Sequence, residues 1–105
     1  MRPPQPDKPA TGTIAVHLDI RGQVQGVGYR SAMQANASEL QLQGWVRNRR
    51  NGSVEAMVQG PVHGVARMLT WCQNGTPLAQ VRQVEQRAQP PEPQWEKFVC
   101  RDTVD

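Results

Sequence analysis

The stretch Thr13–Arg30, with the sequence TIAVHLDIRGQVQGVGYR, contains in order the three local patterns that decide the fold. Residues 13–21 alternate between apolar and polar side chains, and a period of two over this length predicts a half-buried strand. The apolar positions of this alternation are Ile14, Val16, Leu18 and Ile20. The glycines of Gly22–Gly28 then interrupt any regular element. From Tyr29 onward the composition is helical, so the stretch predicts a strand, a glycine-rich loop and a helix.

A helix and a hairpin are expected next along the chain. The segment Tyr29–Leu42 contains neither proline nor glycine, and Gly44 is suited to end a helix there. Apolar residues recur on one face of this helix at Met33, Ala37 and Leu40. Beyond it, Asn51-Gly52 is the strongest short-range signal for a hairpin turn, and strand-like residues flank it on both sides. The pattern therefore predicts paired strands over 45–48 and 54–59.

A second helix and two further strands are expected in the remainder. Pro61 suits the first position of a helix, which Asn74-Gly75 would end. The apolar face of this helix would be formed by Val62, Val65, Leu69 and Cys72. Strict alternation breaks within Ala79–Ala88, which predicts a strand with a bulge, and Trp95–Arg101 has the composition of a short final strand. The order predicts an α+β fold, a ferredoxin-like βαββαβ sandwich in which an antiparallel sheet carries two helices on one face and an extra short C-terminal strand.

Length and composition place these elements in one small domain. The chain has 105 residues, of which 37% are hydrophobic and 5% aromatic, so its core must be small and mainly aliphatic. No apolar run approaches the ~18 residues of a membrane span, and two cysteines are too few for a disulfide scaffold. The first twelve residues hold four prolines and lack the apolar segment of a signal peptide. We therefore expect a disordered Pro-rich tail over 1–12, no membrane association and a cytoplasmic protein.

The charge balance is mildly basic and uneven. Twelve Lys and Arg against nine Asp and Glu give a net charge of +3. Residues 1–52 hold seven basic and three acidic residues, whereas residues 53–105 hold five and six. An anion-binding site is therefore expected in the first half of the chain, although the excess by itself does not indicate nucleic acid.

The loop Gly22–Gly28 and the residues that follow it are suited to binding an anion. Successive backbone N–H groups in a glycine-rich turn that enters a helix form a concave cradle for negative charge. Arg30 adds a guanidinium whose planar fork matches two phosphate oxygens. The alternative is a loop whose glycines serve only a sharp turn, followed by a solvated arginine. The two common nucleotide loops are excluded, because no Gly-Lys-Ser/Thr is present and Ser31 stands where the dinucleotide fingerprint needs a glycine.

Two motifs in register resemble the signature of the acylphosphatase family. They are Gly22–Arg30, and Gly44–Asn48 followed by Asn51–Glu55, and the separation of 18 residues between Arg30 and Asn48 also agrees. The resemblance covers residues 13–103, which we expect to form an acylphosphatase-like domain. It implies a ferredoxin-like fold and hydrolysis of acyl phosphates to a carboxylate and inorganic phosphate, with no metal and no cofactor.

The resemblance also assigns roles to individual residues. Arg30 resembles the phosphate-binding arginine of the family, and Asn48 the asparagine that positions the attacking water. The backbone amides of the cradle would belong to Gln25, Gly26, Val27, Gly28 and Tyr29. Tyr29 stands where the family often has phenylalanine, and both residues are large and aromatic.

Two other functions remain open from the sequence alone. Many ferredoxin-like sheets bind RNA on exposed aromatic residues, but the aromatic-rich RNA-binding octapeptide is missing here, so we expect no nucleic-acid partner. The domain could also serve as an accessory of a larger carbamoyl-transfer enzyme, since relatives of this kind begin long chains. A chain of 105 residues favours a free-standing enzyme, and the lack of an unassigned apolar stripe favours a monomer.

Several other residues could carry chemistry, but structural roles are favoured for most of them. His17 and His63 lie outside both motifs and are expected at the surface. The three tryptophans are expected in the core, at Trp45, Trp71 and Trp95. The hairpin arginines could attract an anionic substrate or simply form a solvated rim, and they are Arg47, Arg49 and Arg50.

Overall fold

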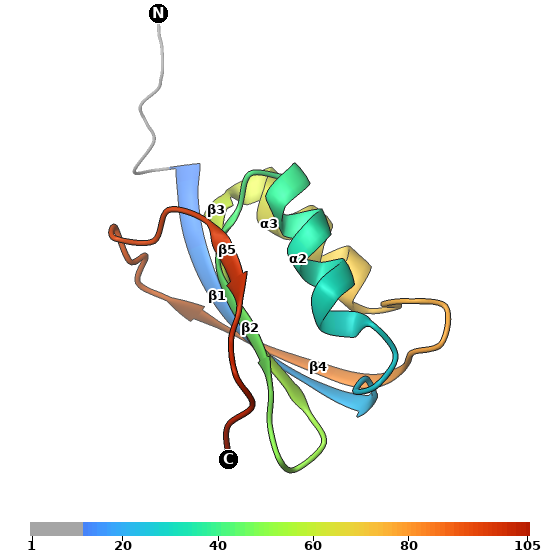
Figure 1. Ribbon diagram of the computed structural model, residues 1–105. Helices are drawn as coiled ribbons and strands as arrows, with labels where there is room; N and C mark the ends of the chain where they lie inside the picture. The colour runs from blue at the N-terminus through green and yellow to red at the C-terminus, as the bar shows by residue number, and fades with distance from the viewer. Residues whose placement is uncertain (1–11) are drawn as a thin grey trace, which may run out of the picture.

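The computed structural model describes residues 12–105 and contains five strands and two helices (Figure 1). The elements are β1 (Thr13–Gln23), α2 (Tyr29–Glu39), β2 (Gln43–Asn48), β3 (Val54–Pro61), α3 (Val62–Cys72), β4 (Gln80–Gln89) and β5 (Phe98–Cys100). This order confirms the ferredoxin-like α+β fold with an added C-terminal strand. Apart from Gly12, the tail expected over 1–12 lies outside the described residues. None of the helices in residues 12–105 has the length and apolar character needed to cross a bilayer.

The strands form one sheet in the order β4-β1-β3-β2-β5. Each strand from β4 to β2 in this order is antiparallel to its neighbour, as expected. By contrast, β5 pairs with β2 in parallel and makes the sheet mixed. The register of β1 and β3 pairs Leu18 with Ala56 and Ile20 with Val54, so apolar side chains share one face. Because Asn48 pairs with Val54, its side chain belongs to this same face at the end of β2.

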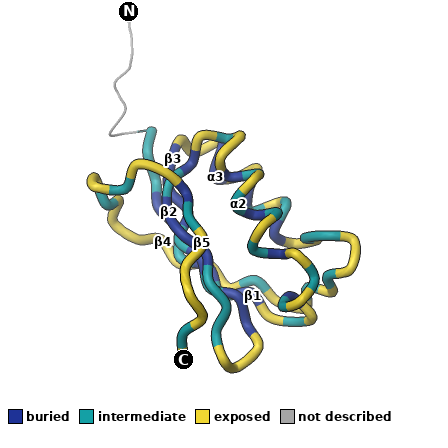
Figure 2. The backbone as a smooth tube through the Cα atoms, viewed as in Figure 1, coloured by how far each residue is buried: buried dark blue, intermediate teal, exposed yellow. Residues whose placement is uncertain are grey.

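The core lies between this face and the two helices, which pack side by side across it (Figure 1). Buried stretches run along the strands and helices, while the loops are largely exposed (Figure 2). Met33 of α2 and Met68 of α3 are fully buried against the strand residues. Each such side chain contributes about 1.5–3 kcal/mol on burial. The fold therefore rests on the aliphatic and methionine core that the composition required.

The buried face of α3 differs from the expected one. Pro61 is the N-cap rather than the first helical residue, and the buried residues of the helix are Gly64, Val65, Met68 and Cys72. At about 100° per residue, Val62 and Leu69 lie at the margin of this stripe. Val62 is accordingly 50% exposed and Leu69 is only partly buried. The predicted stripe is therefore displaced around the helix, because Gly64 and Met68 face the sheet where Val62 and Leu69 were expected.

The β2–β3 hairpin forms at Asn51-Gly52 as predicted, through a three-residue loop. The Gly52 amide donates to the Arg49 carbonyl at 3.1 Å, and the Arg49 amide donates to the Ser53 carbonyl at 2.9 Å. Only Gly52 in this loop has a positive φ, +95°, which is the geometry of a turn followed by a glycine bulge. The bulge expected in β4 is also present, at Arg82 opposite the step from Arg21 to Gly22.

Two boundaries differ from the sequence expectation. Gly44 does not end a helix, because α2 stops at Glu39 and Gly44 lies inside β2 with φ +133°. A Cβ at this position would collide with the Met57 carbonyl oxygen, so close strand approach requires the glycine. The final strand covers Phe98–Cys100 only, but the chain continues along β2, where the Val104 amide donates to the Asn48 carbonyl at 3.0 Å.

Candidate active site

The loop between β1 and α2 turns on two glycines in the left-handed region. Gly26 has φ +75°, and Gly28, the N-cap of α2, has φ +76° and ψ +16°. L-residues adopt this conformation reluctantly, which explains why glycine is present at both positions. No described side chain caps this helix end, and its first turn contains no acidic residue. The positive end of the helix dipole is therefore left open.

Seven consecutive backbone amides in this region have no protein acceptor. The first helical hydrogen bond of α2 runs from the Ala32 amide to the Gly28 carbonyl at 3.0 Å. Within residues 12–105, none of the amides of residues 25–31 donates to a carbonyl or a side-chain oxygen. Unpaired amides at a helix N-terminus and in a glycine-rich turn are donors for an anion. These unpaired amides are candidates for the cradle that the loop sequence predicts.

A small pocket of about 120 Å³ joins this loop to the end of β2. It is lined by Val24, Gly26, Gly28, Tyr29, Arg30, Ser31 and Asn48. Arg30 of α2 and Asn48 of β2 are 18 residues apart in the sequence, and both line this pocket. In the described part of the chain, no group of three or more His, Cys, Asp or Glu is arranged to hold a metal ion.

A second pocket of similar volume lies between the end of β1 and the hairpin. It is lined by Arg21, Gly22, Asn51, Gly52, Ser53 and Arg82. The Arg21 guanidinium is already paired with Asp19 at 2.9 Å, and no helix N-terminus opens into this pocket. The pocket that holds Arg30 and Asn48 adjoins the open N-terminus of α2, so it is the better candidate for an anion site.

Asn48 presents an unpartnered acceptor to the first pocket. Its Oδ1 atom is buried and has no hydrogen-bond partner among the described residues. The backbone around it is held on both sides, because Asn48 pairs with Val54 on β3 and its carbonyl accepts the Val104 amide. A buried carbonyl oxygen without a partner costs about 1–3 kcal/mol, which makes Asn48 Oδ1 a candidate for contact with a ligand.

The Arg30 guanidinium is available for a ligand. Arg30 is the second residue of α2, and the only hydrogen bond of its guanidinium in residues 12–105 is from Nη1 to the Arg101 carbonyl at 3.5 Å. That distance is at the outer limit of hydrogen bonding. None of the described ion pairs involves Arg30. Its positive charge therefore stands beside the free amides without a carboxylate to compensate it.

Two of the expected cradle residues do not line the pocket. The Gln25 side chain points to the hairpin, where Nε2 donates to the carbonyls of Arg49 at 2.7 Å and Ser53 at 2.8 Å. The Val27 carbonyl accepts the Thr76 hydroxyl at 2.7 Å, which attaches the loop to the segment after α3. The amides of Gln25 and Val27 are nevertheless unpaired within residues 12–105. Sequence reasoning gave no signal for these two anchors.

The Tyr29 side chain is a buried anchor rather than an acid or base. Its hydroxyl donates to the Cys72 carbonyl at 2.8 Å, and its ring packs on Trp71 with centroids 5.0 Å apart. Burial raises the pKa of the Tyr29 hydroxyl well above its ordinary value, and it raises the pKa of the Cys72 thiol to about 12. Both groups are therefore neutral near pH 7.

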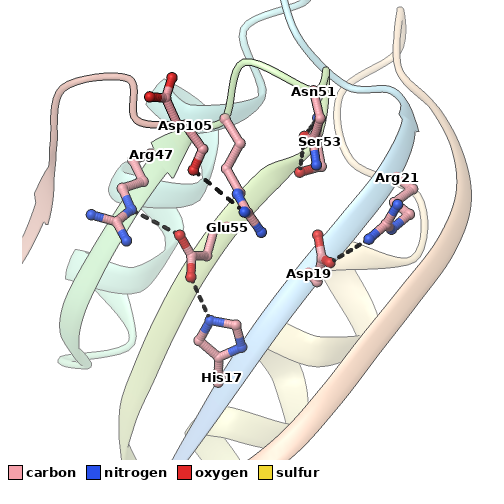
Figure 3. Close-up of polar contacts among 9 residues, drawn as sticks. His17, Asp19, Arg21, Arg47, Asn51, Ser53, Glu55 and Asp105 are labelled. Carbon is pink, nitrogen blue, oxygen red and sulfur yellow. Dashed lines mark hydrogen bonds and ion pairs between the residues drawn. The ribbon is translucent and has the colours of Figure 1, made fainter.

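An ion-pair network occupies the opposite face of the sheet. Glu55 on β3 accepts a hydrogen bond from Arg47 Nε at 2.8 Å and contacts His17 Nε2 at 2.7 Å (Figure 3). His17 is thus half-buried and paired, not the free surface histidine expected from the sequence. Arg47 also lies over the Trp45 ring, 4.5 Å from its centroid. This network is on the face away from Asn48, so it supports the strands rather than the pocket.

The network predicts a loss of stability in acid. Burial raises the pKa of Glu55, but hydrogen bonds from His17 and Arg47 outweigh it and hold the pKa below the ordinary 4.5. The stabilisation is therefore present above pH 4.5 and is lost as the pH falls through the folded-state pKa. Unfolding by urea between pH 7 and pH 3 should show wild type about 1 kcal/mol more stable than Glu55→Gln at pH 7, with the difference vanishing in acid. Glu85→Gln, at an exposed position of β4, is the control; a difference for Glu55→Gln that does not depend on pH would contradict the assignment.

The sequence and the fold are similar to those of one protein family. The family model described as Acylphosphatase matches residues 16–100. An acylphosphatase of Synechococcus sp. (strain JA-2-3B'a(2-13)) is 51% identical over 79 residues, which cover 75% of this chain and 84% of the relative. The structure of an acylphosphatase from Coxiella burnetii superposes with a TM-score of 0.86 at 30% identity, covering 90% of this chain and 99% of that one.

A longer protein contains a similar domain. The structure of HypF from T. kodakarensis matches with a TM-score of 0.74 at 27% identity, and the match covers 84% of this chain but 12% of that one. The relatives named as acylphosphatases, by contrast, match over most of their own length. The chain is therefore an enzyme of the acylphosphatase family, the hydrolases that act on acyl phosphates.

Proposed function

We propose that this chain hydrolyses acyl phosphates in the pocket formed by the β1–α2 loop, Arg30 and Asn48. The observation that carries the proposal is a convergence of three different groups in one small space. Free backbone amides, an uncompensated guanidinium and an unpartnered carboxamide oxygen meet there. The first two suit a phosphate, and the third suits a neutral hydrogen-bond donor such as water.

The amides and Arg30 would bind the phosphoryl group. Amides of residues 25–31 offer donors without carrying charge, and the helix dipole adds a partial positive charge at the same place. Arg30 supplies the full charge, so the ligand should be an anion with several oxygens. As the bond to the leaving group breaks, these donors stabilise the phosphoryl oxygens of a loose transition state.

The leaving group explains why the pocket needs no general acid. An acyl phosphate expels a carboxylate with a pKa of ~4, which leaves without being protonated. The only titratable side chains that line the pocket are Tyr29 and Arg30, and Tyr29 has its pKa raised by burial. The pocket is therefore suited to a mixed anhydride and poorly suited to an ester whose leaving group is an alkoxide.

Asn48 would orient the attacking water. Its Oδ1 accepts one hydrogen bond from the water, which turns a lone pair of the water oxygen toward phosphorus. A neutral carboxamide does not remove a proton, so the water proton passes to an oxygen of the phosphoryl group. A phosphorus–oxygen bond to water forms, the bond to the acyl oxygen breaks, and the products are a carboxylate and dihydrogen phosphate.

Activity on benzoyl phosphate tests the proposal. The purified protein should release benzoate and inorganic phosphate at the same rate with and without a chelator such as EDTA. A phosphate monoester with an alkoxide leaving group, such as glycerol phosphate, should not be hydrolysed measurably. Loss of benzoyl phosphate hydrolysis in the chelator would overturn the metal-free mechanism. We further propose that the monomer is active, so the rate per chain should not change on dilution.

A further inference from the structure

Gln25 is the one loop residue whose side chain connects the amide cradle to the hairpin that carries Asn48. Its Nε2 atom donates both of its hydrogens, to the Arg49 carbonyl at 2.7 Å and to the Ser53 carbonyl at 2.8 Å. Both distances are short for N–H···O bonds, and both acceptors are backbone atoms. The side chain therefore bridges two segments that are 24 and 28 residues apart from it in the sequence.

The two acceptors lie at the base of the hairpin. The strand pairing of β2 with β3 ends at Asn48 opposite Val54. Arg49 follows Asn48 and Ser53 precedes Val54, so both acceptors lie just beyond this last pair. Ser53 and Asn51 close the hairpin locally, since the Ser53 hydroxyl and amide both donate to Asn51 Oδ1 (Figure 3). Those bonds fix the shape of the hairpin but not its place relative to the β1–α2 loop. The Gln25 bonds supply that link directly next to Asn48.

We propose that Gln25 is a positioning residue that sets the distance between Asn48 Oδ1 and the amide cradle. The inference rests on the proposed function, because it assigns Gln25 to the alignment of the water with the bound phosphoryl group. Gln25 is suited to this task since its own amide is unpaired at the start of the residue 25–31 loop while its side chain holds the hairpin. A displacement of about 1 Å between the reacting groups can lower a rate by about 100-fold.

The proposal predicts a specific kinetic defect for Gln25→Ala. Alanine keeps the backbone amide, so the affinity for inorganic phosphate should stay within about twofold of wild type. The kcat on benzoyl phosphate should fall by about 10- to 100-fold, because the water is no longer held in line. Gln25→Glu, which keeps the shape but places carboxylate oxygens against two carbonyl oxygens, should lose at least as much kcat. The measurements are steady-state kinetics and competitive inhibition by inorganic phosphate.

Gln59→Ala provides a matched control. Gln59 also joins two segments through its side chain, since its Nε2 donates to the Glu92 carbonyl at 3.0 Å and its Oε1 accepts the Glu92 amide at 2.7 Å. It lies near the far end of β3, paired with Gln43 and Ala15, and away from the pocket. Gln59→Ala should change the melting temperature but keep the kcat of wild type.

A double-mutant cycle with Asn48→Ala separates positioning from a general loss of structure. If Gln25 acts through Asn48, adding Gln25→Ala to Asn48→Ala should lower kcat by less than twofold further. Full multiplication of the two losses, a wild-type kcat in Gln25→Ala, or loss of phosphate binding in that variant would each overturn the proposal. If wild type itself is inactive on benzoyl phosphate, or Asn48→Ala is as active as wild type, the proposed function fails instead.

Discussion

Replacing Arg30 by alanine is expected to lower kcat/KM on benzoyl phosphate by about 1,000-fold or more and to weaken the binding of inorganic phosphate. The guanidinium stands beside the free amides without a protein counter-ion. It would therefore contact the phosphoryl oxygens in the bound substrate as well as in the transition state. An interaction made in both states changes binding and turnover together.

Arg30→Lys distinguishes charge from geometry. Lysine keeps the positive charge but loses the planar fork that contacts two oxygens, so it should recover phosphate binding in part and turnover poorly. Arg67→Ala, at an exposed position of α3, is the matched control and should behave as wild type. Phosphate inhibition constants and benzoyl phosphate kinetics measure both effects. An Arg30→Ala protein that binds phosphate with wild-type affinity would refute the assignment of this residue.

The fold could be predicted from local patterns because its elements are locally consistent. The alternation in β1, the glycines after it and the turn at Asn51-Gly52 predicted a strand, a loop and a hairpin. All three are present in the folded protein. What could not be predicted depends on contacts between distant segments. The burial of Met68 in place of Val62 follows from which side of α3 packs on the sheet. The place of Gly44 follows from the Met57 carbonyl on a neighbouring strand.

The candidate site also has a part that local sequence predicts and a part that depends on distant contacts. The glycine loop and Arg30 are contiguous in sequence, so their joint role as an anion cradle follows from local rules about helix N-termini. Asn48 has no such local signature, and only the resemblance to a family pointed to it. The Gln25 side chain illustrates the remaining gap, since nothing near it in the sequence indicates bonds to Arg49 and Ser53. Every residue has a backbone carbonyl, so the residue type of the acceptor gives no indication of a long-range hydrogen bond to it.

Asn48→Ala is expected to lower kcat on benzoyl phosphate by about 100- to 1,000-fold while inorganic phosphate binds as it does to wild type. The Oδ1 atom is an unpartnered acceptor in a pocket that also contains Arg30, so it would contact the nucleophile and not the phosphate. An interaction that orients only the attacking water is absent from the phosphate complex. Its loss therefore affects turnover and leaves ground-state binding of the anion unchanged.

Asn48→Asp tests the same role from the opposite direction. A carboxylate is a stronger acceptor for water, but its charge would repel a phosphoryl dianion held a few ångströms away. This variant should therefore lose phosphate affinity at pH 7, which Asn48→Ala does not, and should recover part of it as the pH falls and the carboxylate is protonated. Added salt should weaken the repulsion only partly, because the Oδ1 position is buried. If instead Asn48→Ala and Asn48→Asp lose phosphate binding equally, Asn48 holds the anion itself, and the water must be oriented by another group.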